Sequence, residues 1–448
     1  MQENGTRCFS IRRWKGRSKN SCRSERASLV KVLLIAYEFP PILAAQALRW
    51  FYLSNELVDI GVDIHVVCPD ISTENAFPMD MDARITIHRV WPGPFIGFSQ
   101  RLAGNVWRNS KAANGRNASK PSRLFQAYRI VRSILNAIFY PDVRSEWYPF
   151  ALRKIKKLLR DEKFDAVISS HEPGVDIFVG NYARKLGIPW VIDMGDPLLT
   201  PYSPKWRRGI DLKVERKVIH SASSIWVTAG NVLDLLISRH GASVERKISV
   251  LPQGFSYRRV GRKTKESEQR FLLVFTGNFY RDFRNPIELA KALVGLQDLE
   301  ISFVIAGDNS EFEPMFQGIF GVEFAGKKSH FECLELQRKA DVLVNIGNVQ
   351  SYQIPGKIYE YLGAEKAILH IKTAEGFDPS VELLEETGSG IVVKNCSRQI
   401  EAVLRDMYRQ WADNPEQLTD GRKEDVIKAH SWSHRARTCK ELLKEILH

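Results

Sequence analysis

The 448-residue sequence predicts an α/β protein made of two Rossmann-like domains, each a doubly wound parallel sheet, that face each other across a central cleft. Short apolar runs alternate with segments of helical periodicity, which is typical of parallel strands buried on both faces. The runs form two series separated by a charged segment, and a chain of this length exceeds one ordinary hydrophobic core. Two α/β domains in tandem follow.

The two series of apolar runs define the predicted domains. Residues 31–255 hold the runs KVLLIAY, DIHVVC, RITIHRV, DAVISS, PWVIDM, SSIWVT and ISVLP. Residues 271–425 hold FLLVFTG, ISFVIAG, VEFAG, DVLVNIG, AILHI and GIVV. Residues 256–270 are charged, lack a hydrophobic period and are predicted to be a linker. Residues 426–448 are expected to form a C-terminal helix, with a return to the first domain as one arrangement open to it.

Composition narrows the classes of partner. Residues 1–30 carry eight Lys/Arg against Glu3 and Glu25, and predict a disordered basic arm. A solvated tail and attraction to an anionic membrane surface, at about 1 kcal/mol per basic residue, both stay open for this arm. The net charge of +13 is not accompanied by stacking aromatics on a recognisable module, so nucleic acid is not an expected partner.

Location is inferred from what the sequence lacks. Residues 1–30 have no apolar segment of the kind expected in a secretory signal, the sequence has no run of 18 apolar residues, and its six cysteines are scattered without a CxxC pair. A cytoplasmic protein is expected, with peripheral attachment to the inner membrane face as a further option. The Asp80-Met81-Asp82 triplet has the form of a metal motif but precedes a strand in an unrelated architecture, and we interpret it as chance.

The segment QIPGKIYEYLGAEKAILHI holds the strongest chemical signal. Pro355 is suited to open a helix, so the amides of Gly356 and Lys357 are donors without an acceptor within the helix, which favours a phosphate ligand. Lys357 and Glu360 share one helix face, where a cation can meet a diphosphate and a carboxylate can accept hydrogen bonds from ribose hydroxyls. The alternative is an exposed ion pair worth about 0.2–0.5 kcal/mol.

Several motifs occur together in one order. PGKIYEYLGAEKAIL follows NIGNVQSYQIP, and KVLLIAYEFPP, GIPWVID, LPQGF and FTGNFYRDFRNP precede them. From Lys31 to the terminal SWSHRA, the chain resembles the retaining glycosyltransferases of family four, of the polysaccharide-biosynthesis type, which have the GT-B fold. The resemblance implies an N-terminal acceptor-side domain and a C-terminal domain that binds a nucleotide-sugar.

The resemblance also implies roles for particular residues. Its catalytic set falls on His171, Lys357 and Arg284, and Glu360 matches the glutamate that binds the donor ribose. The other positions implied to bind the donor are Gly277, Asn278, Arg281, Gly326, Lys327, Gln353 and Gly356. The positions expected on the acceptor side are Asp193, Asp196 and Glu172, which follow two neighbouring predicted strands. Without the resemblance, these residues would be interpreted as ordinary turn and loop residues.

The implied reaction moves a sugar from a nucleoside-diphosphate donor to a glycan or lipid-linked saccharide with retained anomeric configuration. No cofactor and no metal ion are expected, because the lysine, the arginine and the helix end can stabilise the leaving diphosphate. The departing phosphate oxygen can itself take the acceptor proton. Water exclusion between the domains would favour transfer over hydrolysis.

Two departures from the family pattern keep other functions open. Ala44 and Ala45 stand where the family has two glycines, and Tyr352 replaces the first of two glutamates eight residues apart. Gln353 is a neutral substitute for that carboxylate. A non-catalytic binding subunit of a polysaccharide assembly complex is the alternative of a different class, and a nucleotide-sugar epimerase or hydrolase is the enzymatic one.

Overall fold

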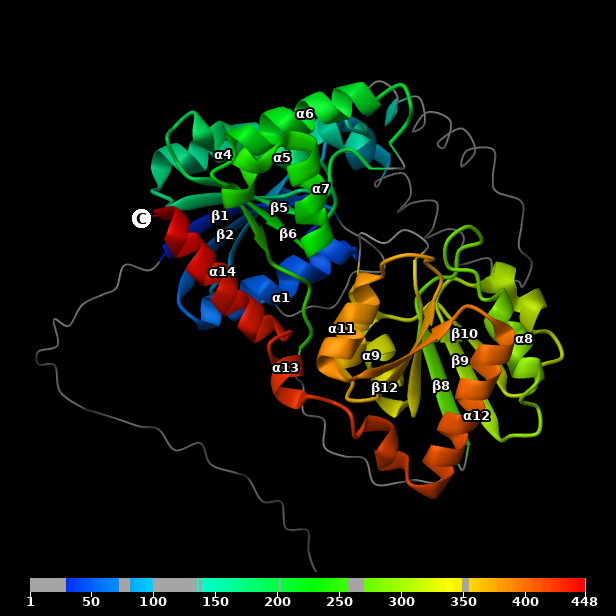
Figure 1. Ribbon diagram of the computed structural model, residues 1–448. Helices are drawn as coiled ribbons and strands as arrows, with labels where there is room; N and C mark the ends of the chain where they lie inside the picture. The colour runs from blue at the N-terminus through cyan, green and yellow to red at the C-terminus, as the bar shows by residue number, and fades with distance from the viewer. Residues whose placement is uncertain are drawn as a thin grey trace, which may run out of the picture.

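The computed structural model describes residues 30–71, 81–99, 135–136, 139–200, 203–256, 270–348 and 354–447 (Figure 1). The expected basic arm lies outside the described residues except for Val30, and the expected linker does so except for Ser256 and Arg270. Tyr352 and Gln353 also lie outside the described residues.

The first domain is a seven-stranded parallel sheet in the order β3-β2-β1-β4-β5-β6-β7. Its strands are β1 (Val30–Ile35), β2 (Val62–Pro69), β3 (Thr86–Val90), β4 (Ala166–Ser170), β5 (Trp190–Met194), β6 (Ser224–Val227) and β7 (Ile248–Val250). Its helices are α1 (Ala45–Asp59), α4 (Tyr148–Asp161), α5 (Val175–Arg184), α6 (Arg208–Ser221) and α7 (Gly230–His240), with short 3-10 turns at Val143–Trp147 and Ala242–Lys247. Each expected apolar run of this domain contains a strand.

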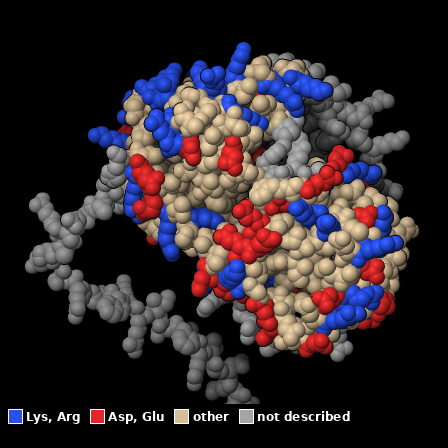
Figure 2. All heavy atoms as spheres, viewed as in Figure 1, with Lys and Arg blue, Asp and Glu red and all other residues tan. Residues whose placement is uncertain are grey.

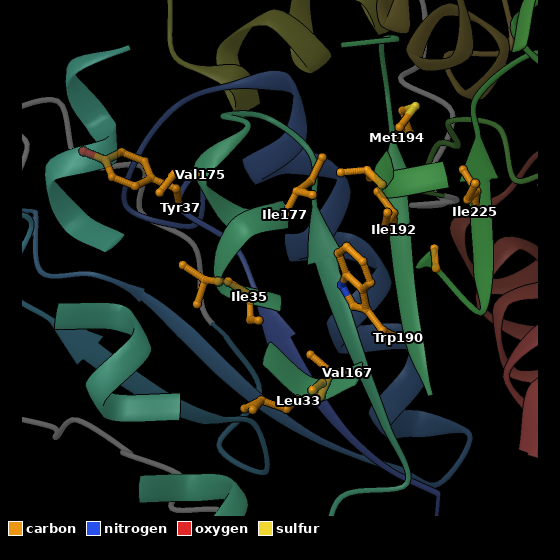
Figure 3. Close-up of a cluster of buried hydrophobic side chains, with 14 of the residues drawn as sticks. Leu33, Ile35, Tyr37, Val167, Val175, Ile177, Trp190, Ile192, Met194 and Ile225 are labelled. Atoms are coloured by element: carbon orange, nitrogen blue, oxygen red, sulfur yellow. The ribbon is translucent and has the colours of Figure 1, made fainter. Parts of the chain in front are cut away.

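Both faces of this sheet are covered, which explains why its strands are apolar at nearly every position. Helices α4 to α7 cover one face, and the core there includes Trp190 and Ile192 of β5 (Figure 3). The Trp190 indole is fully buried and donates to Ser169 Oγ at 3.0 Å, so its one polar atom is satisfied. Helix α1 covers the other face.

The second domain is a six-stranded parallel sheet in the order β10-β9-β8-β11-β12-β13. Its strands are β8 (Phe271–Thr276), β9 (Ile301–Ala306), β10 (Val322–Gly326), β11 (Val342–Ile346), β12 (Ala367–Lys372) and β13 (Gly390–Lys394). Its helices are α8 (Ile287–Val294), α9 (His330–Lys339), α10 (Gly356–Gly363), α11 (Pro379–Thr387) and α12 (Ser397–Asp413), with 3-10 turns at Ser310–Phe316 and Pro415–Thr419. Helices α8 and α12 pack on one face of the sheet, and α10 and α11 pack on the other. Two parallel Rossmann-like sheets are therefore confirmed.

The end of the chain returns to the first domain. After the short helix α13 (Glu424–Lys428), helix α14 (Trp432–Leu447) lies beside α1 in Figure 1 and buries Cys439 and Leu443 against the first sheet. The crossing point is held by backbone hydrogen bonds, from Phe255 N to His430 O at 3.3 Å and from Trp432 N to Phe255 O at 2.9 Å. The two chain segments that cross between the domains, one at Phe255 and one at 430–432, are thus hydrogen-bonded to each other.

Among the described residues, none of the helices combines the length and the apolar character needed to span a bilayer.

Candidate functional site

Strand order reverses between β1 and β4 in the first sheet and between β8 and β11 in the second. Open α/β sheets bind ligands beyond the carboxyl ends of their strands at such points. A cleft of about 790 Å³ lies here between the two domains. Residues that follow each of the four strands line it, among them Ala44, Glu172, Asn278 and Asn348.

The cleft brings together half of the residues that the sequence singled out. Those that line it are Glu172, Asp196, Asn278, Arg284, Gly356, Lys357 and Glu360. Those that do not line it are His171, Asp193, Gly277, Arg281, Gly326 and Lys327. Gln353 lies outside the described residues.

The residues away from the cleft have separate reasons for their positions. Arg281 is 63% exposed at its side chain and lies 3.7 Å from Glu311. Gly326 and Lys327 are exposed at the end of β10. Gly277 has φ +144°, a conformation that favours glycine, and turns the chain after β8.

His171 is buried directly after β4, one residue before the cleft begins. Its backbone N donates to Asp193 O at 2.9 Å, and its ring Nδ1 has no hydrogen-bond partner among the described residues. Burial, together with the charge of Arg144, lowers the pKa of His171 to about 4. The imidazole is therefore neutral at pH 7 and does not reach the cleft in this arrangement.

Lys357 and Glu360 lie at the opening of α10, as the helical spacing predicts. Lys357 Nζ is 2.9 Å from Glu360 Oε2, and Gln337 Nε2 donates to the same oxygen at 3.0 Å. Gln337 also donates to Thr276 Oγ1 at 2.8 Å, so the end of β8 is tied to the glutamate. This pair is not the exposed helix-surface pair of the alternative interpretation, because the Glu360 side chain is only 14% exposed.

The charge on Glu360 is held by its neighbours. Burial raises the pKa of Glu360, but the Lys357 ammonium, the nearby His330 and the hydrogen bonds from Lys357 and Gln337 outweigh burial and lower the pKa below its ordinary value. Burial likewise lowers the pKa of Lys357, and the charge of Glu360 more than offsets it, so the pKa is raised. Both groups are ionised at neutral pH inside the cleft.

Arg284 adds a second cation to the second-domain wall. Its Nη2 donates to Asn348 Oδ1 at 2.8 Å, which joins the loop after β8 to the loop after β11. Its Nε is buried and has no hydrogen-bond partner among the described residues. Asn278 is committed to the loop itself, since its Oδ1 accepts from Asp308 N at 2.9 Å. Arg284 therefore keeps an N–H donor for a ligand.

The first domain contributes another helix N-terminus to the cleft. Helix α1 begins at Ala45, and Ala44, Ala45 and Gln46 line the cavity. Ala44 has φ −147° and ψ 162°, which is extended backbone that any residue adopts. Ala45 is not among the described residues with positive φ either, so neither alanine is strained at the positions where the resemblance expects glycines. The helix N-termini of α1 and α10 approach one cleft from opposite domains.

Glu172 and Asp196 lie together on the first-domain wall. Burial raises the pKa of Glu172 to about 8, and the charge of Asp196 beside it adds to the effect. Burial also raises the pKa of Asp196, although a hydrogen bond from Glu172 opposes the shift. At pH 7 Glu172 is therefore the protonated member and donates to the Asp196 carboxylate.

Asp193 has a structural partner that sequence reasoning missed. Arg49 donates to both of its carboxylate oxygens at 2.9 Å, and both side chains are fully buried. The same guanidinium donates to Leu251 O at 2.9 Å and to Pro252 O at 3.0 Å, at the exit from the first domain. Asp193 is therefore used to anchor the junction, and it is not placed to contact an acceptor. No local motif announces this pair, because its members are 144 residues apart.

Two further residues link the domains beside Glu360. The Tyr52 hydroxyl on α1 is 2.9 Å from His330 Nε2 on α9, and the other ring nitrogen of His330 lies 3.8 Å from Glu360 Oε1. Tyr52 also stacks on Trp432 of α14, with ring centroids 5.7 Å apart. These contacts join elements of different domains that are far apart in the sequence, so no local sequence pattern could have predicted them.

Among the described residues, no three His, Cys, Asp or Glu side chains are grouped so that they could hold a metal ion.

A family model described as Glycosyltransferase Family 4 matches residues 113–259, which is less than half of the chain. No curated protein matches the sequence. The match lies mainly in the first domain and includes β4 to β7.

The fold is also similar to solved structures along nearly the whole chain. A glycosyltransferase from Rickettsia africae has a TM-score of 0.60 at 14% identity, with 94% of this chain and 99% of that chain covered. TarM has a TM-score of 0.62 at 10% identity, with 93% and 99% covered. The lipopolysaccharide outer core galactosyltransferase WaaB has a TM-score of 0.53 at 12% identity, with 93% and 99% covered. At identities this low, the structural similarity shows the fold alone, which is GT-B. Together with the family match, it supports a glycosyltransferase.

Proposed function

We propose that the protein transfers a sugar from a nucleoside-diphosphate donor to a glycan or lipid-linked saccharide, with retained anomeric configuration and as part of surface polysaccharide synthesis. One observation carries the proposal. Two helix N-termini, Lys357 and Arg284 converge on a single interdomain cleft that also holds an ionised glutamate, Glu360.

Each of these groups has a chemical task in the proposed reaction. The amides that open α10 and the Lys357 ammonium stabilise charge that develops on the leaving diphosphate. Arg284, whose Nε has no hydrogen-bond partner in the part of the chain that the structure describes, is assigned to hold a phosphate oxygen. Glu360 is an acceptor for the two hydroxyls of a ribose. His171 has no contact assigned, because its ring does not reach the cleft in this arrangement.

The proton of the acceptor hydroxyl goes to the departing phosphate oxygen in the proposed mechanism. Glu360 is not assigned as a general base for that proton, since it is engaged by Lys357 and Gln337. No metal ion or cofactor is assigned. Retention is tested by NMR on the first-formed anomer of the product: an α product from an α donor supports it, and a β product contradicts it.

A thermal-shift panel tests the donor site. UDP-, GDP-, ADP- and CMP-sugars are added to the wild type and to Lys357→Ala and Glu360→Ala. A ligand at about 100 times its dissociation constant stabilises the fold by about 2.7 kcal/mol. We expect one class of nucleotide to raise the melting temperature of the wild type, and each substitution to abolish most of the shift.

Matched controls come from exposed ion pairs with the same i, i+3 spacing. Lys291→Ala on α8 and Glu441→Ala on α14 remove members of such pairs away from the cleft. Both controls should keep the full nucleotide shift. If no nucleotide-sugar stabilises the wild type at millimolar concentration, or if the controls lose the shift as well, the donor site proposed here is wrong.

A peripheral position on the cytoplasmic membrane face belongs to the same proposal, because a lipid-linked acceptor resides there. Lys and Arg gather on the outer side of the first domain over α4 and α6 (Figure 2). The exposed basic residues on these helices are Arg153, Lys156, Lys157, Arg160, Arg208, Lys213, Arg216 and Lys217. Sedimentation with anionic vesicles that is lost in high salt would support the proposal, and sedimentation that is equal with neutral vesicles would contradict it.

A further inference from the structure

A row of four side chains in contact with one another runs across the cleft from the first domain to the second. It consists of Trp432 on α14, Tyr52 on α1, His330 on α9 and Glu360 on α10. All four line the cavity between the domains. One end of the row lies where the backbone crosses between the domains, and the other end is the carboxylate that the proposed function assigns to the ribose.

The crossing between the domains fixes the position of the Tyr52 ring. This ring stacks on the Trp432 indole, with ring centroids 5.7 Å apart and an angle of 10° between the planes. Trp432 N donates to Phe255 O at 2.9 Å. A Cβ at Gly254 would lie 2.9 Å from Trp432 Cδ2, so the indole packs directly against the crossing segment. The Tyr52 hydroxyl is therefore held in a defined direction.

His330 connects the Tyr52 hydroxyl to the Glu360 carboxylate. Its Nε2 is 2.9 Å from Tyr52 Oη, and its Nδ1 lies 3.8 Å from Glu360 Oε1. Burial lowers the pKa of His330, while Glu360 opposes this shift and Lys357 adds to it, so the ring is neutral at pH 7 and carries one proton. The neighbouring carboxylate favours that proton on Nδ1, and Nε2 then accepts from the Tyr52 hydroxyl.

The two carboxylate oxygens of Glu360 have different surroundings. Lys357 Nζ and Gln337 Nε2 both contact Oε2, at 2.9 Å and 3.0 Å, whereas Oε1 faces His330. The place of the His330 ring therefore limits how the carboxylate can turn and from which direction a ligand hydroxyl can reach Oε1. Because hydrogen bonds weaken steeply when their angle is poor, a displaced ring would weaken the bond to that hydroxyl.

We infer that Tyr52 of the first domain is a positioning residue for the ribose of the donor nucleotide, and that it acts through His330 on the Glu360 carboxylate. The inference rests on the proposed function, in which Glu360 accepts hydrogen bonds from the ribose hydroxyls. It adds a determinant of selectivity for ribose over deoxyribose that comes from the opposite domain. Full selectivity for the ribose then requires that Tyr52 and His330 be in contact across the cleft.

Isothermal titration calorimetry on the full chain measures this selectivity, with UDP, GDP and ADP and the 2′-deoxy counterpart of each. We expect the wild type to bind one of the three ribonucleotides about tenfold more tightly than its deoxy counterpart, the effect of one hydrogen bond. Tyr52→Phe keeps the ring that stacks on Trp432 and removes the hydroxyl. It should weaken the ribonucleotide more than the deoxynucleotide, so that the preference falls to about threefold or less.

The ratio of the two affinities separates positioning from a general loss of packing. Both affinities are measured on one protein, so a smaller folded fraction does not change their ratio. Looser packing at Tyr52 would weaken both nucleotides equally and leave the ratio as it is in the wild type, which would overturn the inference. Tyr408→Phe is the matched control, because this α12 ring packs against Phe271 on the face of the second sheet opposite α10. It should keep both affinities.

A second pair of variants tests whether Tyr52 acts through His330. In His330→Ala the preference for ribose should already be low, and adding Tyr52→Phe should lower it no further. If Tyr52→Phe lowers the preference by the same factor with and without the His330 ring, the hydroxyl contacts the nucleotide itself and the inference is wrong.

Failure of the donor site and failure of this inference give different results. If the wild type binds none of UDP, GDP and ADP, the donor site is wrong and the inference is wrong with it. If the wild type binds a nucleotide without preferring its ribose form, the assignment of Glu360 to the ribose is wrong as well. If the wild type prefers the ribose form and Tyr52→Phe keeps that preference, only the role of Tyr52 is overturned.

Discussion

Two glutamates in one cleft differ in charge at pH 7: Glu360 is ionised and Glu172 is protonated. Glu360 has Lys357 at 2.9 Å, and its pKa falls below the ordinary value. Burial, and after it the charge of the neighbouring Asp196, raises the pKa of Glu172 to about 8. One wall of the cleft therefore combines cations with an ionised acceptor, and the opposite wall holds a shared proton.

The raised pKa of Glu172 predicts a pH-dependent loss of stability. Between the ordinary value of 4.5 and about 8, the folded chain holds a proton that the unfolded chain releases. Folding stability from this group is therefore lost as pH rises through that window. Glu172→Gln removes this contribution, so its melting temperature should match the wild type near pH 5 and exceed it near pH 8.

The comparison is made by melting both proteins at several pH values. Asp298→Asn is the control, because its exposed carboxylate has a lowered pKa and is ionised in folded and unfolded chains throughout this range. Asp298→Asn should change the melting temperature by the same amount at each pH. If the melting temperatures of Glu172→Gln and the wild type differ by the same amount at every pH, Glu172 is not protonated at neutral pH.

At the scale of single residues, the sequence predicts contacts between side chains that are close in the chain and misses contacts between side chains that are far apart in it. The placement of Lys357 and Glu360 on one helix face follows from their spacing of three residues. The use of Asp193 does not follow from any local pattern, because Arg49 reaches it from another helix. An unpaired strand-end carboxylate and a carboxylate that holds a buried arginine look the same in the sequence.

At the scale of elements, the strands were predictable because burial on both faces leaves continuous apolar runs. All the expected runs contain strands in sheets of seven and six. Their order within each sheet was not predictable from the runs themselves. That order places the ends of β1, β4, β8 and β11 at the cleft, and so it decides which loops form the site.

Helix α14 is the element that most changes the picture of separate domains. Its sequence shows an apolar stripe but not the surface that the stripe covers. In the structure, Cys439 and Leu443 are fully buried against the first sheet, although the chain has just left the second domain. The first hydrophobic core is thus completed by the last residues of the chain.

Truncation of one α14 side chain should therefore destabilise the first domain. Leu443→Ala is expected to cost about 2–5 kcal/mol, because a fully buried leucine leaves both lost transfer energy and a cavity. Lys444→Ala, its exposed neighbour, should change stability by about 0.5 kcal/mol or less. Urea unfolding followed by tryptophan fluorescence measures both. Equal stabilities of the two variants would show that α14 is not part of the first core.

At the scale of the whole molecule, the two domains share one site and are joined beside it. Tyr52 contacts His330 across the cleft and Trp432 on α14, while Arg49 holds the exit from the first domain. His330 of α9 therefore contacts both Glu360 in its own domain and Tyr52 in the other. The site exists only when both domains are present.

The most direct measurement of the central claim is hydrogen–deuterium exchange with UDP, GDP and ADP, each tested in turn at saturating concentration. We predict slower exchange with one of them in peptides that span Phe275–Arg284 and Gly356–Glu360, where the loop after β8 and the first turn of α10 line the cleft. Peptides of α12 (Ser397–Asp413), which pack on the opposite face of the second sheet, should be unchanged. No protection with any nucleotide, or protection confined to α12, would contradict a nucleoside-diphosphate site between the domains.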